Sequence, residues 1–175
     1  MQDIADQLHR AFEGEAWHGP SLAQVLAGVG LHDAAAHPIA GAHSIWELVL
    51  HVTAWTRVVA RRLAGENADQ PEEGDFPEVL EATADAWDAA KAGLAGAQQE
   101  LLARVNAFSK KRLMEPFRDS NYYVLLHGQA QHLAYHGGQI ALLKRALQRC
   151  LSMAPNIAVI AKQSRHLLIR IDLLS

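Results

Sequence analysis

Apolar residues recur three or four positions apart along three long stretches of the chain. These stretches are 45–63, 77–105 and 121–150, and a shorter one with the same spacing lies at 3–12. Such a period places the apolar side chains of a stretch on one face of an α-helix. Because no segment between them reads as a convincing strand, we predict an all-α fold in which four helices bury these faces against one another as a four-helix bundle.

Capping residues predict where these helices begin. Ser44 is followed three residues later by Glu47, the spacing of a capping box, which predicts a helix from residue 45 to about residue 64. Pro77 suits the first position of the next long helix, because proline has no N–H to donate and a helix-compatible φ. Either Asp119 or Ser120 can cap the last long helix.

The length of 175 residues is typical of one domain with a single hydrophobic core. We assign residues 1–150 to the bundle and residues 151–175 to a C-terminal extension of unassigned structure. Its apolar, β-branched run at 157–160 and its alternation at 169–173 are compatible with a strand-like arm, a further helix or a tail.

Charge and composition exclude several classes of protein. Residues 66–100 hold ten acids and one base, whereas 104–170 hold eleven bases and two acids, an asymmetry that neighbouring helices can use to attract one another. No nucleic-acid motif accompanies the basic half, so we expect no nucleic-acid partner. No run of about 18 uncharged apolar residues exists and the N-terminus carries acids, so we expect a cytoplasmic protein without membrane attachment.

Histidine is over-represented, and three of the ten histidines form a candidate metal site. His132 and His136 lie one helical turn apart, as residues that chelate one ion do. His51 lies among Leu48, Val52 and Trp55 and is expected to face the same apolar interior. The single cysteine leaves imidazole and carboxylate as ligands. Buried histidines satisfied by hydrogen bonds are the alternative interpretation.

Two segments of the chain resemble a known family. The segments HSIWELVLH at 43–51 and QHLAYHGGQI at 131–140 look like the two signature regions of the DinB-like superfamily, and WHGPS at 17–21 is similar to its N-terminal region. The resemblance covers about residues 1–150. It implies a four-helix bundle, one divalent transition-metal ion on His51, His132 and His136, and frequently a homodimer.

Such a site fits two reaction classes on a small-molecule substrate. Three neutral ligands leave coordination positions open, and zinc, nickel, copper and iron all suit imidazole. Hydrolysis needs a carboxylate base, for which Glu47 is the best candidate, although the capping box already explains this residue. Transfer to a low-molecular-weight thiol needs no such base, and some DinB-like proteins are thiol-dependent S-transferases. A non-enzymatic, metal-binding or stress-associated bundle is the third hypothesis.

Other residues near the three histidines have two interpretations each. Gln139 either orients a ligand or joins two helices. Trp55 and Tyr135 line either a pocket or the core. His43 serves the cap region or approaches the site, whereas His127 lies on the opposite side of its helix from His136 and cannot share its ion.

Overall fold

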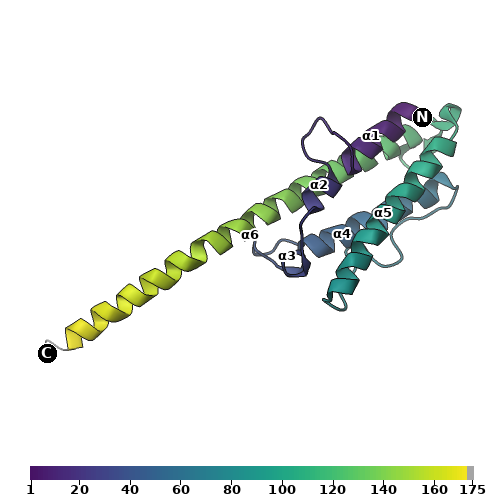
Figure 1. The fold of residues 1–175 in the computed structure, drawn as a ribbon. Helices are drawn as coiled ribbons and strands as arrows, with labels where there is room; N and C mark the ends of the chain where they lie inside the picture. The colour runs from purple at the N-terminus through teal and green to yellow at the C-terminus, as the bar shows by residue number, and fades with distance from the viewer. Residues whose placement is uncertain (173–175) are drawn as a thin grey trace.

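The computed structural model describes the backbone of residues 1–172 and the side chains of residues 1–149. The chain is mainly helical, which confirms the predicted all-α class (Figure 1). In chain order the elements are α1 (Gln2–Phe12), α2 (Leu22–Leu26), α3 (Leu31–Ala35), α4 (Ile45–Leu63), α5 (Ala84–Ala107), the 3-10 turn η1 (Lys110–Arg112), β1 (Pro116–Phe117), β2 (Ser120–Asn121) and α6 (Tyr122–Asp172).

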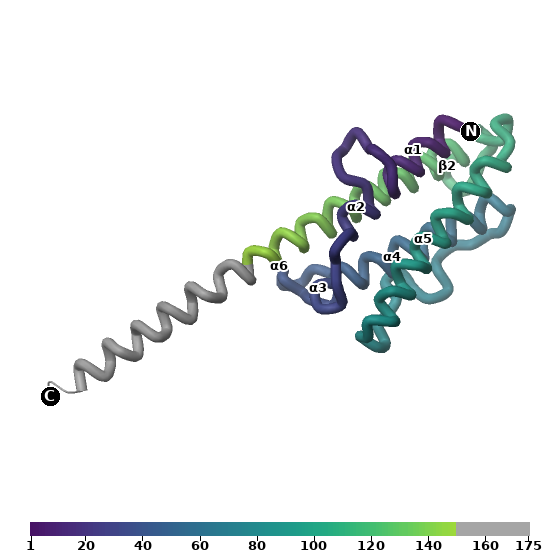
Figure 2. Tube along the Cα trace, viewed as in Figure 1, coloured from purple at the N-terminus to yellow at the C-terminus, as the bar shows by residue number. Residues whose placement is uncertain are grey.

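The four longest of these helices pack in a closed ring. α1 contacts α6 and α5, and α4 likewise contacts α5 and α6, so each helix has two neighbours. Figure 2 shows the result along the chain, with the first helix lying beside the last one. The short helices α2 and α3 pack against α6 and α4 respectively. This arrangement is the predicted four-helix bundle, and it makes α4 and α6 neighbours.

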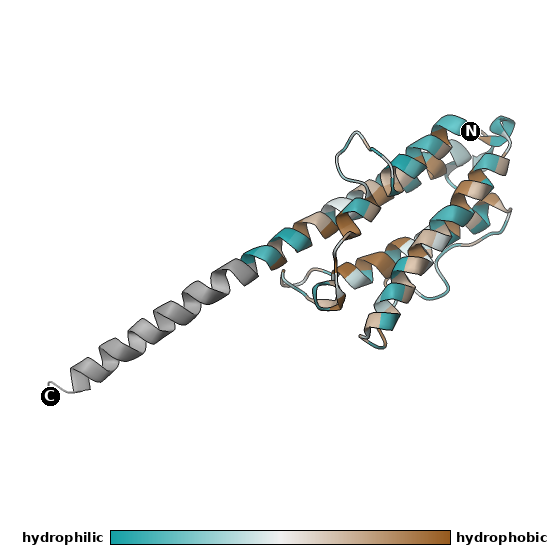
Figure 3. Ribbon diagram, in the orientation of Figure 1, coloured by the Kyte–Doolittle hydropathy of each residue, from teal (hydrophilic) through white to brown (hydrophobic). Residues whose placement is uncertain are grey.

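The core lies between these helices. Its fully buried members include Leu8 of α1, Val49 of α4, Leu101 of α5 and Leu133 of α6, one from each long helix. Figure 3 shows α4 as a largely hydrophobic helix, in keeping with its central place. Some buried polar groups pair across the bundle, because an unpaired one costs stability. The Gln129 amide of α6, for example, donates to Thr56 Oγ1 of α4 at 2.9 Å.

The capping box predicted at the start of α4 is confirmed. The Glu47 N–H donates to Ser44 Oγ at 3.1 Å, and the Ser44 N–H donates to Glu47 Oε2 at 2.7 Å. Two of the free N–H groups at the helix start are thereby satisfied. The register of α4, and with it the inward direction of His51, is fixed from this end.

The predicted start of α5 at Pro77 is wrong. The helix begins at Ala84, and the Thr83 hydroxyl caps it by accepting from the Ala86 N–H at 3.2 Å. The residues from Pro77 to Thr83 are not helical, and Leu80 among them is exposed. Proline tolerates a first helical turn but does not require one, and here a better cap lies six residues later.

Two further local expectations differ from the structure. The two-residue strands β1 and β2 form an antiparallel hairpin that contains both Asp119 and Ser120. The cap of α6 is therefore Asn121, whose Oδ1 accepts from the Val124 N–H at 3.0 Å. Arg118 makes the tight turn with a φ of 55°. The connection between α2 and α4, where we predicted no helix, also contains the single-turn helix α3.

The assignment of residues 1–150 to one unit and of 151–175 to an extension stays a prediction. Of the three alternatives for the extension, the backbone of residues 151–172 is helical and continues α6, and residues 173–175 lie outside the described backbone. Among the helices of the described chain, none combines the length and apolar character that crossing a membrane requires.

Candidate metal centre

The three predicted ligands come together between α4 and α6. One nitrogen from each of His51, His132 and His136 lies within 4.8 Å of the other two. The closest pair is His51 Nε2 and His132 Nε2, 3.0 Å apart. The three ring centroids are separated by 4.4 to 5.0 Å, so the rings surround one point rather than stack in a row.

His51 is braced from the side opposite to the other histidines. Its Nδ1 lies 2.7 Å from the backbone carbonyl oxygen of Asp75 and 3.3 Å from the Asp75 carboxylate. Both partners are acceptors only, so Nδ1 carries the hydrogen and donates it. In the neutral ring the lone pair is then on Nε2, the atom that faces His132. An acceptor that bonds to the other ring nitrogen in this way fixes the tautomer of a metal-binding histidine.

His136 is braced in the same way from within α6. Its Nδ1 donates to Gln139 Oε1 at 2.6 Å, three residues further along the helix. Gln139 thus orients a histidine, which is one of the two roles predicted for it. The Nε2 of His136 is left with its lone pair, as in His51.

His132 has no such brace. Its Nδ1 is buried and lacks a hydrogen-bond partner among the described residues. Burial, and then the nearby His136 and His51, lower the pKa of His132 to about 4. Burial also lowers the pKa of His136, although the bond to Gln139 acts in the opposite direction. Both rings are therefore neutral near pH 7, the form that binds metal.

The geometry fits one divalent ion. With metal–nitrogen bonds of 2.0–2.1 Å, two nitrogens on a tetrahedral ion lie roughly 3.3 Å apart, close to the separation of His51 Nε2 and His132 Nε2. His51 and His136, with their hydrogens on Nδ1, each present an Nε2 lone pair that a cation can bind, whereas without a cation His132 Nε2–H can donate to His51 Nε2 at the same distance. The cluster is thus compatible with a bound transition metal, and three ligands leave room for a further one.

Two residues that sequence reasoning missed cover the site. Phe76 stacks on His51 with a centroid distance of 4.2 Å, and its other side stacks on His43 at 3.7 Å. Its neighbour Asp75 supplies the carbonyl that holds His51 and also accepts from Trp55 Nε1 at 2.7 Å. Both lie in the aperiodic segment before α5, where no spacing predicts a contact with α4.

Glu47, the candidate base, is engaged elsewhere in the structure. Besides the Ser44 N–H, its Oε2 lies 3.1 Å from His37 Nε2 and 3.5 Å from His43 Nδ1. Burial raises the pKa of Glu47, but the bonds from Ser44 and His37 outweigh it and the pKa is lowered. The carboxylate is not a member of the three-histidine cluster. Its catalytic role stays a prediction.

The remaining predicted neighbours fall on different sides of the site. Trp55 is half-buried, with its ring centroid 6.5 Å from that of His51. Tyr135 is exposed and touches His136 edge-on at 5.0 Å, so it belongs to the rim and not to the core. His127 packs against Tyr123 with the two rings tilted and their centroids 4.3 Å apart, and it lies outside the cluster, as its helical phase predicts.

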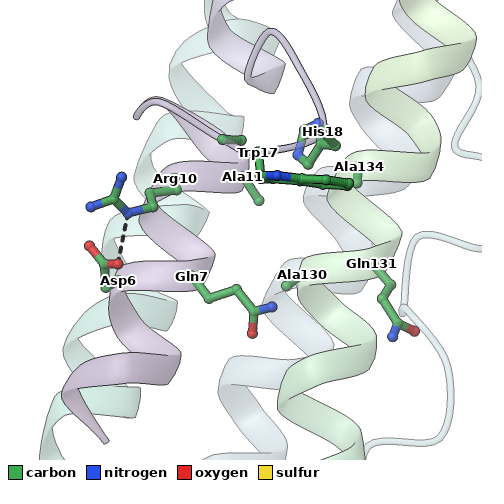
Figure 4. A pocket seen from close by; sticks show the side chains of 10 residues that line it. Asp6, Gln7, Arg10, Ala11, Trp17, His18, Ala130, Gln131 and Ala134 are labelled. Atoms are coloured by element: carbon green, nitrogen blue, oxygen red, sulfur yellow. Dashed lines mark hydrogen bonds and ion pairs between the residues drawn. The ribbon is translucent and has the colours of Figure 1, made fainter.

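Two cavities flank α6 on opposite sides. One of about 220 Å³ opens beside His132, between α4 and α6. The other, of about 450 Å³, lies between α1 and α6 and is lined by Ala130 and Ala134, which point away from His132 around the helix. Figure 4 shows the Trp17 ring reaching across this second cavity toward Ala134. It contains none of the three histidines, so the first cavity is the one associated with the site.

A four-helix bundle with an interior three-histidine cluster defines the class of the molecule: helical bundles that build a metal site from facing helices. The family follows from the sequence match. The chain belongs to the DinB superfamily, whose family profile matches residues 16–140. This range includes all three histidines. Neither a curated protein nor a solved structure matches the chain.

Proposed function

We propose that the protein binds one divalent transition-metal ion through Nε2 of His51, His132 and His136 and is a metal-dependent enzyme acting on a small molecule. The observation that supports this most directly is the bracing of two histidines through Nδ1, which leaves their Nε2 lone pairs directed into the cluster. Membership of the DinB superfamily agrees with it.

Within this proposal we favour thiol-dependent transfer over hydrolysis. A divalent ion polarises a bound group and lowers the pKa of a bound thiol or water. The chain's own contribution is to hold the ion with neutral ligands, which keeps its full charge, and to exclude water with Phe76 on one side. Hydrolysis also needs a base, and the two nearest carboxylates, Glu47 and Asp75, already bond to a helix cap and to Trp55.

The metal site is tested by the metal content of protein purified without a nickel column. We expect about one transition-metal ion per chain, and loss of most of it in His132→Ala. The matched control is His127→Ala, which removes a histidine from the same helix but outside the cluster. Unchanged metal content in His132→Ala would falsify the proposed site. Elemental analysis of the same samples identifies the metal.

The reaction class is tested with 1-chloro-2,4-dinitrobenzene and a panel of small thiols. In the expected reaction the thiol sulfur forms a bond to the ring carbon, chloride leaves and the thiol proton goes to solvent. We expect conjugation only with the metal-loaded protein and an accepted thiol, and its loss in His51→Ala. Failure with every thiol, combined with thiol-free turnover of esters or lactones, reverses the choice in favour of hydrolysis. Absence of both, with a metal that only raises the melting temperature, supports the non-enzymatic bundle.

The homodimer and the cytoplasmic location that the sequence led us to expect stay predictions.

A further inference from the structure

The cavity beside His132 contains a buried cation. Arg62 of α4 is only 8% exposed, yet it lines this cavity together with His132, Trp55 and Gln129. Its guanidinium remains charged at every ordinary pH, and a charge in such a place is costly unless it is paired. The partners of Arg62 therefore show what this cavity is built to accept.

Those partners are backbone oxygens and aromatic rings and not carboxylates, since the guanidinium carbon lies 5.8 Å from the ring centroid of Trp55 and 5.9 Å from that of Phe117. Nε donates to the Ala68 carbonyl at 2.8 Å, and Nη2 donates to the Asp69 carbonyl at 2.9 Å. Nη1 has no hydrogen bond within the part of the chain that has described side chains, and no carboxylate there lies within 4.0 Å of the guanidinium. Arg57 and Arg61, on the same helix, are by contrast both paired with glutamates.

A second arginine increases the local positive charge. Arg118 donates to the same Ala68 carbonyl at 2.9 Å and forms an ion pair with the Asp69 carboxylate. Two guanidiniums thus share one carboxylate, which leaves a net charge of about +1. Burial, and then Arg118, lower the pKa of Arg62, which is the direction expected for a cation short of anionic partners.

We propose that this cavity binds the carboxylate of a small molecule at Arg62, while the other end of the same molecule reaches the three histidines. The inference rests on the proposed function and adds a substrate class to it. The walls between the two ends include Val59, Val124 and Leu125, which suit an aliphatic connection. The carboxylate belongs either to the thiol or to its acidic co-substrate, and in both cases Arg62 recognises it through the same charged hydrogen bonds.

The spacing of His51 and Arg62 along α4 sets the length of a small molecule that reaches both. Arg62 follows His51 by 11 residues, three turns, so both lie on one face with their Cα atoms about 16 Å apart. Side chains incline toward the helix N-terminus, and an arginine reaches about 6 Å in that direction. About 10 Å remains to be spanned, the length of a six- to eight-carbon chain.

The test compares thiols that differ only in carrying an acid or an alcohol. Full-length protein loaded with Co²⁺ is titrated with 6-mercaptohexanoate and 6-mercaptohexan-1-ol, and binding is followed by the thiolate–cobalt absorption. A hydrogen bond between charged groups corresponds to a preference of about 10- to 100-fold for the acid. The shorter pair, 3-mercaptopropionate and 3-mercaptopropan-1-ol, should show a ratio near one because the acid cannot reach Arg62.

Two variants remove the preference in independent ways. Arg62→Met keeps the aliphatic stem and removes the charge, whereas Val124→Glu, at an exposed position of the cavity wall, supplies a competing carboxylate and leaves Arg62 in place. Both should bring the six-carbon ratio to about one. The controls Val124→Gln and Arg57→Met should keep the wild-type ratio. The inference is overturned if the wild-type ratio is near one, or if the ratio is unchanged in both Arg62→Met and Val124→Glu.

Metal-free protein separates this inference from the proposed function. If cobalt is not taken up, the metal site fails, and calorimetric titration with hexanoate and hexan-1-ol then decides on Arg62 alone. A preference for hexanoate that disappears in Arg62→Met supports the carboxylate site, and equal binding overturns it. A further titration of the cobalt-loaded protein shows which molecule carries the carboxylate. If hexanoate still binds when 3-mercaptopropan-1-ol saturates the metal, the carboxylate belongs to the co-substrate. If the two ligands exclude each other, it belongs to the thiol.

Discussion

Gln139 offers a test of how the metal ligands are held. Gln139→Leu removes the acceptor that fixes His136 through Nδ1 at 2.6 Å while keeping a helix-forming side chain of similar size. The His136 N–H is then left without its partner, and the ring is free to rotate or change tautomer. Removing the hydrogen-bond partner of a metal-binding histidine weakens metal binding about 10- to 100-fold, which corresponds to about 1.4–2.7 kcal/mol.

The assay is competition for Zn²⁺ with a chromophoric chelator at pH 7.5. Gln139→Glu keeps an acceptor at the same position and should bind zinc at least as tightly as the wild type. Gln131→Leu makes the same chemical change on the same helix but in the cavity between α1 and α6, so it should have no effect. A zinc affinity of Gln139→Leu within twofold of the wild type would refute the reasoning.

Three other outcomes are expected. Because His132 has a pKa of about 4 in the folded protein and an ordinary value near 6.5 when unfolded, only the unfolded chain takes up its proton between these pH values. The free energy of unfolding of metal-free protein should therefore fall as the pH is lowered from 6.5 to 4, less steeply in His132→Gln, as urea titrations would show. Leu133→Ala should cost about 2–5 kcal/mol in the same titrations because Leu133 is fully buried, whereas Leu142→Ala, at an exposed site of α6, should stay within about 0.5 kcal/mol. Phe76→Ala should destabilise the metal-free protein by about 1–2 kcal/mol, since it removes the ring stacked on His51, and calorimetry at pH 7.5 would measure it.

The long helices and the inward direction of the three histidines were predictable from the sequence. Period and capping residues are local properties, and they placed His51, His132 and His136 on buried faces. They did not bring His51 next to His132, which is 81 residues away. That pairing depends on which helices become neighbours in the bundle, and the family resemblance supplied it.

The outer parts of the site could not be predicted in this way. Asp75 holds His51 through a backbone carbonyl, a group that every residue carries, so no side-chain pattern marks it. The start of α5 predicted at Pro77 is wrong for a related reason, because proline tolerates the first position of a helix but does not require one. Arg62 did leave a signal, since it lies three turns after His51 on the same face, but only the packed structure shows that it is buried without a carboxylate.

The bracing of His51 by the Asp75 carbonyl means that the metal ion would join three separate parts of the chain: α4, the segment before α5, and α6. These parts lie far apart in the sequence, so the complete site forms only once α4, α6 and this segment have packed together. Metal binding would then stabilise the folded state by linking these parts, and it would add about 2.7 kcal/mol to the free energy of unfolding at a free metal concentration one hundred times the Kd. Metal occupancy would accordingly report on whether these three parts of the chain are packed together.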